Sequence, residues 1–125
     1  MLVAGDFVFV AGLPPFDPVS GEVTRRPFEQ PPDLVLGQMK RGLEAVGSSM
    51  EQVVKCSIYC TGPAYYGAFN EAYVRYFPDE APARIFLCVP CFFWPYDVEV
   101  DCIAVVRSSE VWRDAAARAW WATWL

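Results

Sequence analysis

The clearest structural signal in the chain is the stretch Asp97-Val-Glu-Val-Asp-Cys-Ile-Ala-Val-Val106, whose residues alternate between two chemical kinds. Small apolar side chains occupy every second position, and three of the positions between them are acidic. Because neighbouring side chains of a strand point to opposite faces, this alternation predicts a β-strand that packs one face on the core. The apolar set is Val98, Val100, Cys102 and Ala104, and the acidic set is Asp97, Glu99 and Asp101.

Four further segments predict strands. Three of them are rich in β-branched or aromatic residues and are bounded by turn-forming residues, and the shorter first one is expected as the first arm of a hairpin. The first two are expected to form a hairpin around Gly5-Asp6. The segments are 1–4, 7–12, 53–61 and 83–89. The faces expected to be shared are Val54, Cys56, Ile58 and Cys60 in the third segment, and Arg84, Phe86 and Cys88 in the fourth.

Two segments predict helices. Pro31-Pro-Asp33 opens the first helix, because proline is tolerated in a first turn, and Gly47 is expected to end it. The second follows Gly62-Pro63 and ends before Pro78. Their apolar residues recur at helical spacing: Leu36, Met39, Leu43 and Val46, then Tyr66, Phe69, Tyr73 and Phe77. This order of elements predicts an α+β domain with both helices on one face of a mixed sheet.

The length of 125 residues predicts one core. We expect the domain to span 1–107 and to be followed by a tryptophan-rich extension over 108–125. In that extension Trp112, Ala116, Trp120 and Trp124 recur every four residues, which favours a short helix. The sheet face away from the two helices is too apolar for water, so we also expect a closed oligomer.

Composition excludes several classes of function. The net charge is −5 and the ten Lys and Arg residues are scattered, which disfavours nucleic-acid binding. The chain has no histidine, so Ser-His-Asp sites, Cys-His sites and His-ligated metals are excluded. No apolar run reaches the 18 residues typical of a membrane span, and there is no signal-peptide pattern. We therefore expect a cytoplasmic protein without membrane or nucleic-acid partners.

The five cysteines lie in predicted strands or at their ends, as reduced thiols packed as small hydrophobic groups often do. Cys88-Val-Pro-Cys91 has the spacing of a zinc knuckle or a redox pair. A structural zinc site needs four ligands, and no second CxxC is present. We expect core thiols, no metal and no cofactor.

Charged residues interrupt two otherwise apolar strands, at Arg84 and at Glu99 with Asp101. A buried charge is costly unless it is paired, so each of them requires a partner or a ligand. One interpretation is a structural ion pair between Arg84 and Glu99 or Asp101. The other is an arginine fork that binds a carboxylate in two places, beside a carboxylate that handles water.

The sequence resembles the reactive intermediate deaminase (Rid, or YjgF-like) family from Gly5 to Arg107. The resemblance implies a chorismate-mutase-like α+β fold that assembles as a homotrimer, with a ligand cleft at each subunit interface. Its matching segments occur in the family's order and spacing: Gly5-Asp-Phe-Val-Phe-Val-Ala-Gly12, Asp17-Pro-Val-Ser-Gly-Glu22, Gly42-Leu-Glu-Ala-Val-Gly47, Gln52-Val-Val-Lys55, Phe69-Asn-Glu-Ala-Tyr73 with Tyr76-Phe77, Pro82-Ala-Arg84 and Val98-Glu-Val-Asp-Cys-Ile-Ala104.

The resemblance also implies an activity, the hydrolytic deamination of 2-imino or 2-enamino acids to 2-oxo acids and ammonia. In deaminating members, the arginine that matches Arg84 binds the substrate carboxylate, and the glutamate that matches Glu99 positions or activates the water. The remaining site residues that the resemblance implies are Asn70 and Gly12, which line the cleft, and Ile85 and Phe86, whose backbone contacts the substrate.

Some positions depart from the family pattern and leave other functions open. Deaminating members often have Ser or Thr before the glycine of the cleft, where this chain has Ala11. The family's first strand segment also usually carries a tyrosine that caps the pocket, and this sequence begins after that position. A non-catalytic trimer that binds small carboxylates is therefore the alternative function. The bulky Phe92-Phe-Trp94 indicates either a pocket for an aromatic substrate or packing against the tail. Ribonuclease activity, named for some members, is disfavoured by the charge of −5.

Overall fold

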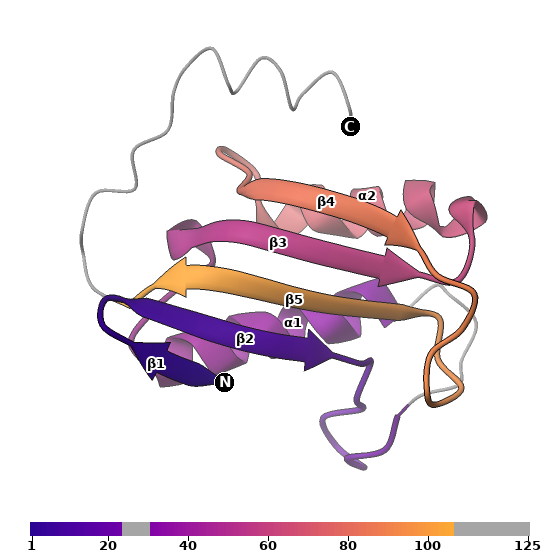
Figure 1. Ribbon diagram of the computed structural model, residues 1–125, viewed down its shortest axis with the longest axis horizontal. Helices are drawn as coiled ribbons and strands as arrows, with labels where there is room; N and C mark the ends of the chain where they lie inside the picture. The colour runs from indigo at the N-terminus through magenta and orange to yellow at the C-terminus, as the bar shows by residue number, and fades with distance from the viewer. Residues whose placement is uncertain (24–30, 107–125) are drawn as a thin grey trace.

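The computed structural model describes residues 1–23 and 31–106 of the protein (Figure 1). Its strands are β1 (Leu2–Ala4), β2 (Phe7–Leu13), β3 (Val53–Cys60), β4 (Ala83–Cys88) and β5 (Val98–Val105). Its α-helices are α1 (Pro31–Ala45) and α2 (Tyr66–Tyr76), and two 3-10 turns cover Met50–Gln52 and Pro63–Tyr65. The strands form one sheet in the order β1-β2-β5-β3-β4, with both α-helices along one face (Figure 1). The predicted α+β architecture is confirmed.

The alternating stretch 97–106 forms β5, at the centre of the sheet. It runs antiparallel to β2 on one side and to β3 on the other, while β4 pairs with β3 in parallel. Its apolar set is buried under the helices, as predicted: Val98, Val100, Cys102 and Ala104. The expected hairpin is also present, as β1 pairs with β2 and Gly5 takes a positive φ of 59° in the turn between them.

The predicted phase of β3 is wrong at its first residues. Val53 is fully buried and Val54 is only half-buried, whereas the strict alternation places Val54 on the core face. The register of β3 against β5 shifts between Val53 and Lys55, so one extra residue is accommodated there. Such an irregularity moves a side chain to the other face of the sheet, and the sequence pattern does not reveal it.

Both helices bury the faces that the sequence spacing indicates. Leu36, Met39 and Leu43 of α1 are fully buried, and Gly47 follows the helix with a positive φ of 82°, which suits its predicted role at the helix end. In α2, Phe69 and Tyr73 are fully buried. Tyr66, expected on the same face, is 37% exposed, because it begins the helix at the rim of the sheet.

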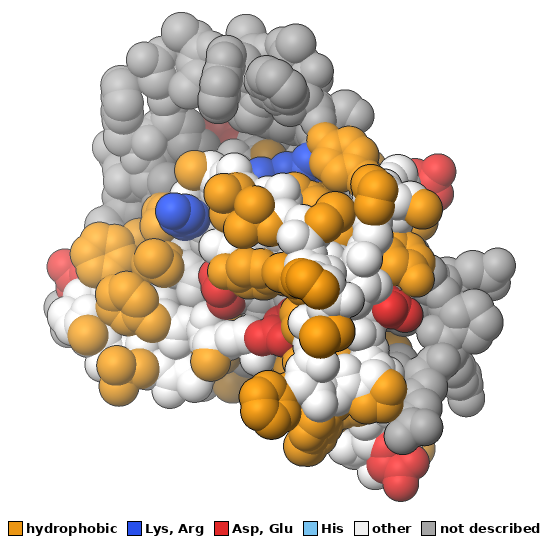
Figure 2. All heavy atoms as spheres, turned by 45° about the vertical axis from the view of Figure 1, so that its right-hand side comes forward, with side chains coloured by type: hydrophobic (Ala, Val, Ile, Leu, Met, Phe, Trp, Pro, Cys, Tyr) orange, Lys and Arg blue, Asp and Glu red, His pale blue; other side chains and the backbone are white. Residues whose placement is uncertain are grey.

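The sheet face away from the helices stays open in a single chain. Phe7 and Phe9 alternate with the buried Val8 and Val10, and Ile85 and Leu87 alternate with half-buried residues of β4. All four aromatic and aliphatic side chains are more than two-fifths exposed: Phe7, Phe9, Ile85 and Leu87. Figure 2 shows hydrophobic side chains gathered around a few acidic ones on the visible side of the molecule. The predicted helix over 108–125 lies outside the described residues. Within the part that is described, no helix has the length and apolar character to cross a membrane.

Candidate functional site

Arg84 lies on β4, the edge strand, and its side chain extends over the helix-covered face toward α2. Its register partner on β3 is the buried Cys56, which fixes the face. The guanidinium Nη1 donates a hydrogen bond of 2.8 Å to Oδ1 of Asn70, and Nη2 donates one of 3.4 Å to the hydroxyl of Tyr66. Two residues of the helix thus orient the guanidinium group.

Aromatic rings complete the surroundings of this guanidinium. Its central carbon lies 4.7 Å from the ring centre of Tyr73 and 5.8 Å from those of Tyr66 and Phe86. Cation–π contacts of this kind attract the charge without using its N–H donors. Among residues 1–23 and 31–106, Arg84 forms no ion pair. The group is therefore a positioned cation with donors left over for an anion.

Three further predicted residues lie beside Arg84. Asn70 is 8% exposed and is oriented by its bond to the guanidinium, which accounts for a polar side chain in an apolar region. The ring of Phe86 packs edge-on against Phe69 at 5.5 Å, so this half-buried side chain packs against the core. Ile85 points to the open face. Since β4 is an edge strand, its outer backbone groups are the ones that could meet a ligand.

Glu99 lies on the open face of β5, opposite Tyr59 of β3. Its Oε2 accepts a 2.7 Å hydrogen bond from the hydroxyl of Tyr96. Its Oε1 occupies the space above Gly12, where an added Cβ would overlap it. Any larger residue at position 12 would collide with the carboxylate of Glu99, so glycine suits this position. The structure brings these two predicted residues into direct contact.

Tyr96 is a candidate site residue that the sequence alone did not indicate. Burial, together with the hydrogen bond to Glu99 and the charge of its carboxylate, raises the pKa of Tyr96 to about 12, so the hydroxyl remains a donor at neutral pH. Its ring stacks on Phe92 at 4.7 Å. The available signal was an aromatic residue three positions before the candidate acid, at the end of a bend.

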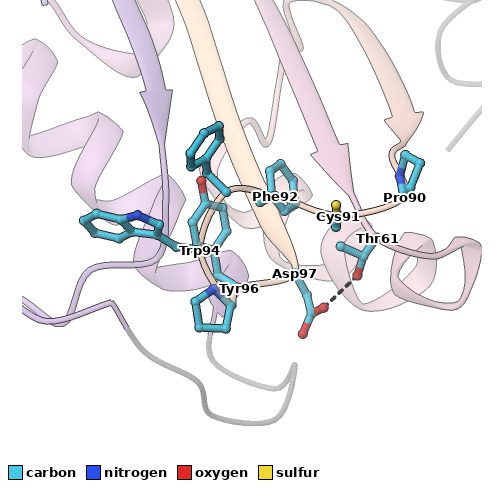
Figure 3. A pocket seen from close by; sticks show the side chains of 9 residues that line it. Thr61, Pro90, Cys91, Phe92, Trp94, Tyr96 and Asp97 are labelled. Carbon is cyan, nitrogen blue, oxygen red and sulfur yellow. Dashed lines mark hydrogen bonds between the residues drawn. The ribbon is translucent and has the colours of Figure 1, made fainter.

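The aromatic bend, residues 89–97 between β4 and β5, forms a hollow of about 700 Å³ at the ends of β3 and β4 (Figure 3). A hydrogen bond of 2.7 Å from Thr61 to Asp97 ties the bend to β3. Tyr96 belongs both to the lining of the hollow and to the partners of Glu99. The residues that line it are Thr61, Pro90, Cys91, Phe92, Phe93, Trp94, Pro95, Tyr96 and Asp97.

The ion pair considered as a structural role for Arg84 is absent within the described chain, so that interpretation is wrong. Arg84 shares a face with Cys56 under the helices, whereas Glu99 and Asp101 share the open face. Asp101 instead accepts a 3.2 Å hydrogen bond from Tyr59. One chain thus carries two separate candidate half-sites, Arg84 with Asn70 and Glu99 with Gly12. No group of three or more Cys, Asp or Glu side chains in 1–23 and 31–106 could hold a metal ion.

Comparison with known proteins supports one family. A protein-family model described as Endoribonuclease L-PSP matches residues 1–106. A RutC family protein of Pyrococcus horikoshii is 34% identical over 102 residues, which cover 82% of this chain and 79% of that protein. Reactive Intermediate Deaminase A of Arabidopsis thaliana, chloroplastic, is 31% identical over 103 residues, 82% of this chain and 55% of that protein.

A solved structure from Thermotoga maritima has the same fold. It superposes with a TM-score of 0.80 at 37% sequence identity, and the match covers 86% of this chain and 84% of that one. Fold and sequence therefore agree on the same group of proteins.

Proposed function

The chain belongs to the family described as Endoribonuclease L-PSP, and from this premise we propose that it hydrolyses 2-imino and 2-enamino acids to 2-oxo acids and ammonia. The observation that carries the proposal is the oriented guanidinium of Arg84, which has spare donors and no carboxylate partner in the described residues. A relative named Reactive Intermediate Deaminase A supports the same chemistry.

Arg84 binds the substrate carboxylate in this proposal. A guanidinium fork matches the two oxygens of a carboxylate, and a charge-assisted bond of this kind contributes about 1.5–3 kcal/mol. Asn70 holds the fork from behind, and the outer backbone of Ile85 and Phe86 offers further polar groups. The substrate is thereby fixed by the end that does not react.

Glu99 positions and activates the hydrolytic water in this proposal. An imine carbon is already electrophilic, so its hydrolysis requires a positioned water and a proton shuttle but no nucleophilic side chain. The carboxylate relays the first proton of the water to nitrogen as the water oxygen adds to the carbon, which gives a carbinolamine. It then relays the hydroxyl proton to nitrogen as the C–N bond breaks and the carbonyl forms. One imino acid and one water thus yield one 2-oxo acid and one ammonia. Tyr96 and Gly12 fix the carboxylate for this step.

We assign the two half-sites of one cleft to different subunits of a homotrimer. Arg84 and Glu99 of one chain lie on opposite faces of the sheet, so a small substrate can meet both only where two chains adjoin. The open apolar face, which includes Phe7, Phe9 and Leu87, is the surface that such an assembly would cover. The domain that forms this assembly is the predicted 1–107 unit.

The charge of the chain favours a small anion over RNA. With ten basic and fifteen acidic residues, the net charge is −5, and long-range attraction of a phosphate backbone is absent. A single positioned guanidinium is enough for a small carboxylate. We therefore propose the deaminase chemistry and not the nuclease chemistry that the family description names.

The test is release of ammonia and 2-oxo acid when 2-aminoacrylate or 2-iminobutanoate is generated beside the protein. Arg84→Ala should abolish turnover, and Glu99→Gln should lower the rate about 10²–10⁴-fold. The matched control is Arg75→Ala, since Arg75 is an exposed arginine paired with Asp33 and should be dispensable. Full activity in both site variants would refute the assignment. Binding of 2-oxo acids without turnover by the unmodified protein would favour the carboxylate-binding trimer instead.

A further inference from the structure

Two thiols meet where strands β3 and β4 end. Cys60 and Cys88 are the last residues of these strands, are direct partners in the parallel register, and have their Sγ atoms 3.8 Å apart. We propose that this pair is an oxidation site, at which Cys60 and Cys88 form a reversible disulfide in the folded protein. This proposal does not depend on the deaminase activity.

The backbone already has the spacing that a disulfide requires. Neighbouring strands lie about 4.8 Å apart, which is within the range of Cα separations of about 4.4–6.8 Å found in disulfides. The backbone N–H of Val89 donates a 2.8 Å hydrogen bond to the carbonyl of Cys60, so the strands are still paired beyond the thiols. Side-chain rotation alone can bring the sulfur atoms into bonding distance, without separation of the strands.

The other possible cysteine pairs are less suited to this reaction. Cys91, which completes the CxxC motif with Cys88, is exposed in the aromatic bend, and Cys88 makes its thiol contact with Cys60 instead. Cys56 and Cys102 are register partners on β3 and β5, but both are buried in the core, where an oxidant cannot reach them. The structure thus selects one pair out of five cysteines.

The two thiols differ in a way that suits stepwise oxidation. Cys88 is exposed and Cys60 is buried, so an oxidant reaches Cys88 first. A peroxide would oxidise Cys88 to a sulfenic acid with release of one water. The sulfur of Cys60 would then attack that of Cys88, lose its proton and expel a second water. Two thiols and one hydrogen peroxide thus give one disulfide and two waters.

The experiment treats the folded full chain with a small excess of hydrogen peroxide, alkylates the remaining thiols, and maps the crosslinked peptides by mass spectrometry. We expect one intramolecular crosslink between Cys60 and Cys88, a mass lower by two hydrogens, and full reversal by dithiothreitol. Cys88→Ser should abolish the crosslink. The matched control Cys91→Ser, which removes an exposed cysteine from the same region, should leave it unchanged.

Three results would overturn the proposal. The first is a crosslink between Cys88 and Cys91, and the second is a crosslink between chains. The third is oxidation of Cys88 to a sulfinic acid while Cys60 stays reduced. Because Cys88 is exposed, its serine variant should remain folded, and its circular dichroism spectrum provides that check.

Discussion

The absence of a side chain at Gly12 leaves room for the carboxylate of Glu99. The carboxylate of Glu99 fills the position that a Cβ of Gly12 would take, and the overlapping atom is the end of a flexible side chain. Gly12→Ala should therefore move the carboxylate at little cost to folding. We expect kcat to fall about tenfold or more while KM changes little, because the substitution leaves the proposed carboxylate contact of Arg84 unchanged. Steady-state kinetics of ammonia release measure both values.

Gly67→Ala is the control for this substitution. A Cβ added at Gly67, on the exposed side of α2, meets nothing within 4 Å. Alanine is favoured over glycine in helices by about 1 kcal/mol, so this variant should be slightly more stable and fully active. Equal activity of the two alanine variants would contradict the role given to the space above Gly12.

The hydroxyl of Tyr96 should make the stability of the protein depend on pH. Its pKa in the folded protein, about 12, lies above its ordinary value of 10.0, so the protonated hydroxyl stabilises the folded state. That contribution is complete below pH 10 and is lost as the pH rises through 12. Compared with Tyr96→Phe, the unmodified protein should be more stable at pH 7, and the difference should shrink at pH 11. Urea unfolding at the two pH values measures it, and a constant difference would exclude the bond to Glu99 as its source.

The residues of the site could be predicted from the sequence to different extents. Arg84 and Glu99 stand out because each places a charge in an apolar strand, and the family resemblance assigns their roles. Tyr96 could not be found in this way, because its contact with Glu99 depends on how the bend before β5 folds back. Periodicity describes which face a strand residue occupies, but it does not describe the reach of a loop side chain.

The packing of α2 against β4 positions Arg84. Phe69 of α2 is fully buried and packs edge-on against Phe86 of β4. Phe69→Ala should lower the free energy of unfolding by about 3–5 kcal/mol, because it leaves a cavity at this contact. Val19→Ala, at a position 95% exposed, should change it by less than about 0.5 kcal/mol. Chemical denaturation would test both, and equal stabilities would contradict this account of the core.

Most elements followed from local patterns, and the exceptions have local causes. The hairpin, both helices and β5 agree with turn residues and periodicity that the sequence displays. The start of β3 departs from prediction because the register shift between Val53 and Lys55 is set by pairing with β5. Pairing is a property of two distant segments, so the sequence of one of them does not contain it.

The assembled sheet separates Arg84 from Glu99 and Asp101, the charged groups that the sequence suggested could pair. Alternation along β4 and β5 gives the face of each residue only relative to its own strand. The register of Arg84 with Cys56 and of Glu99 with Tyr59 places the two groups on opposite sides. This relation depends on the complete sheet, and it is the reason for proposing a cleft shared between subunits.

The most direct test of that cleft is the activity of mixed assemblies. The Arg84→Ala and Glu99→Gln variants, each expected to be inactive alone, would be co-expressed with different tags. Oligomers that contain both variants would then be purified through the two tags. Their mass should be three times that of the chain. If each cleft takes Arg84 from one subunit and Glu99 from the next, every such particle contains one intact cleft and should show about one-third of the unmodified activity. Mixed trimers that assemble but remain inactive would contradict the shared cleft.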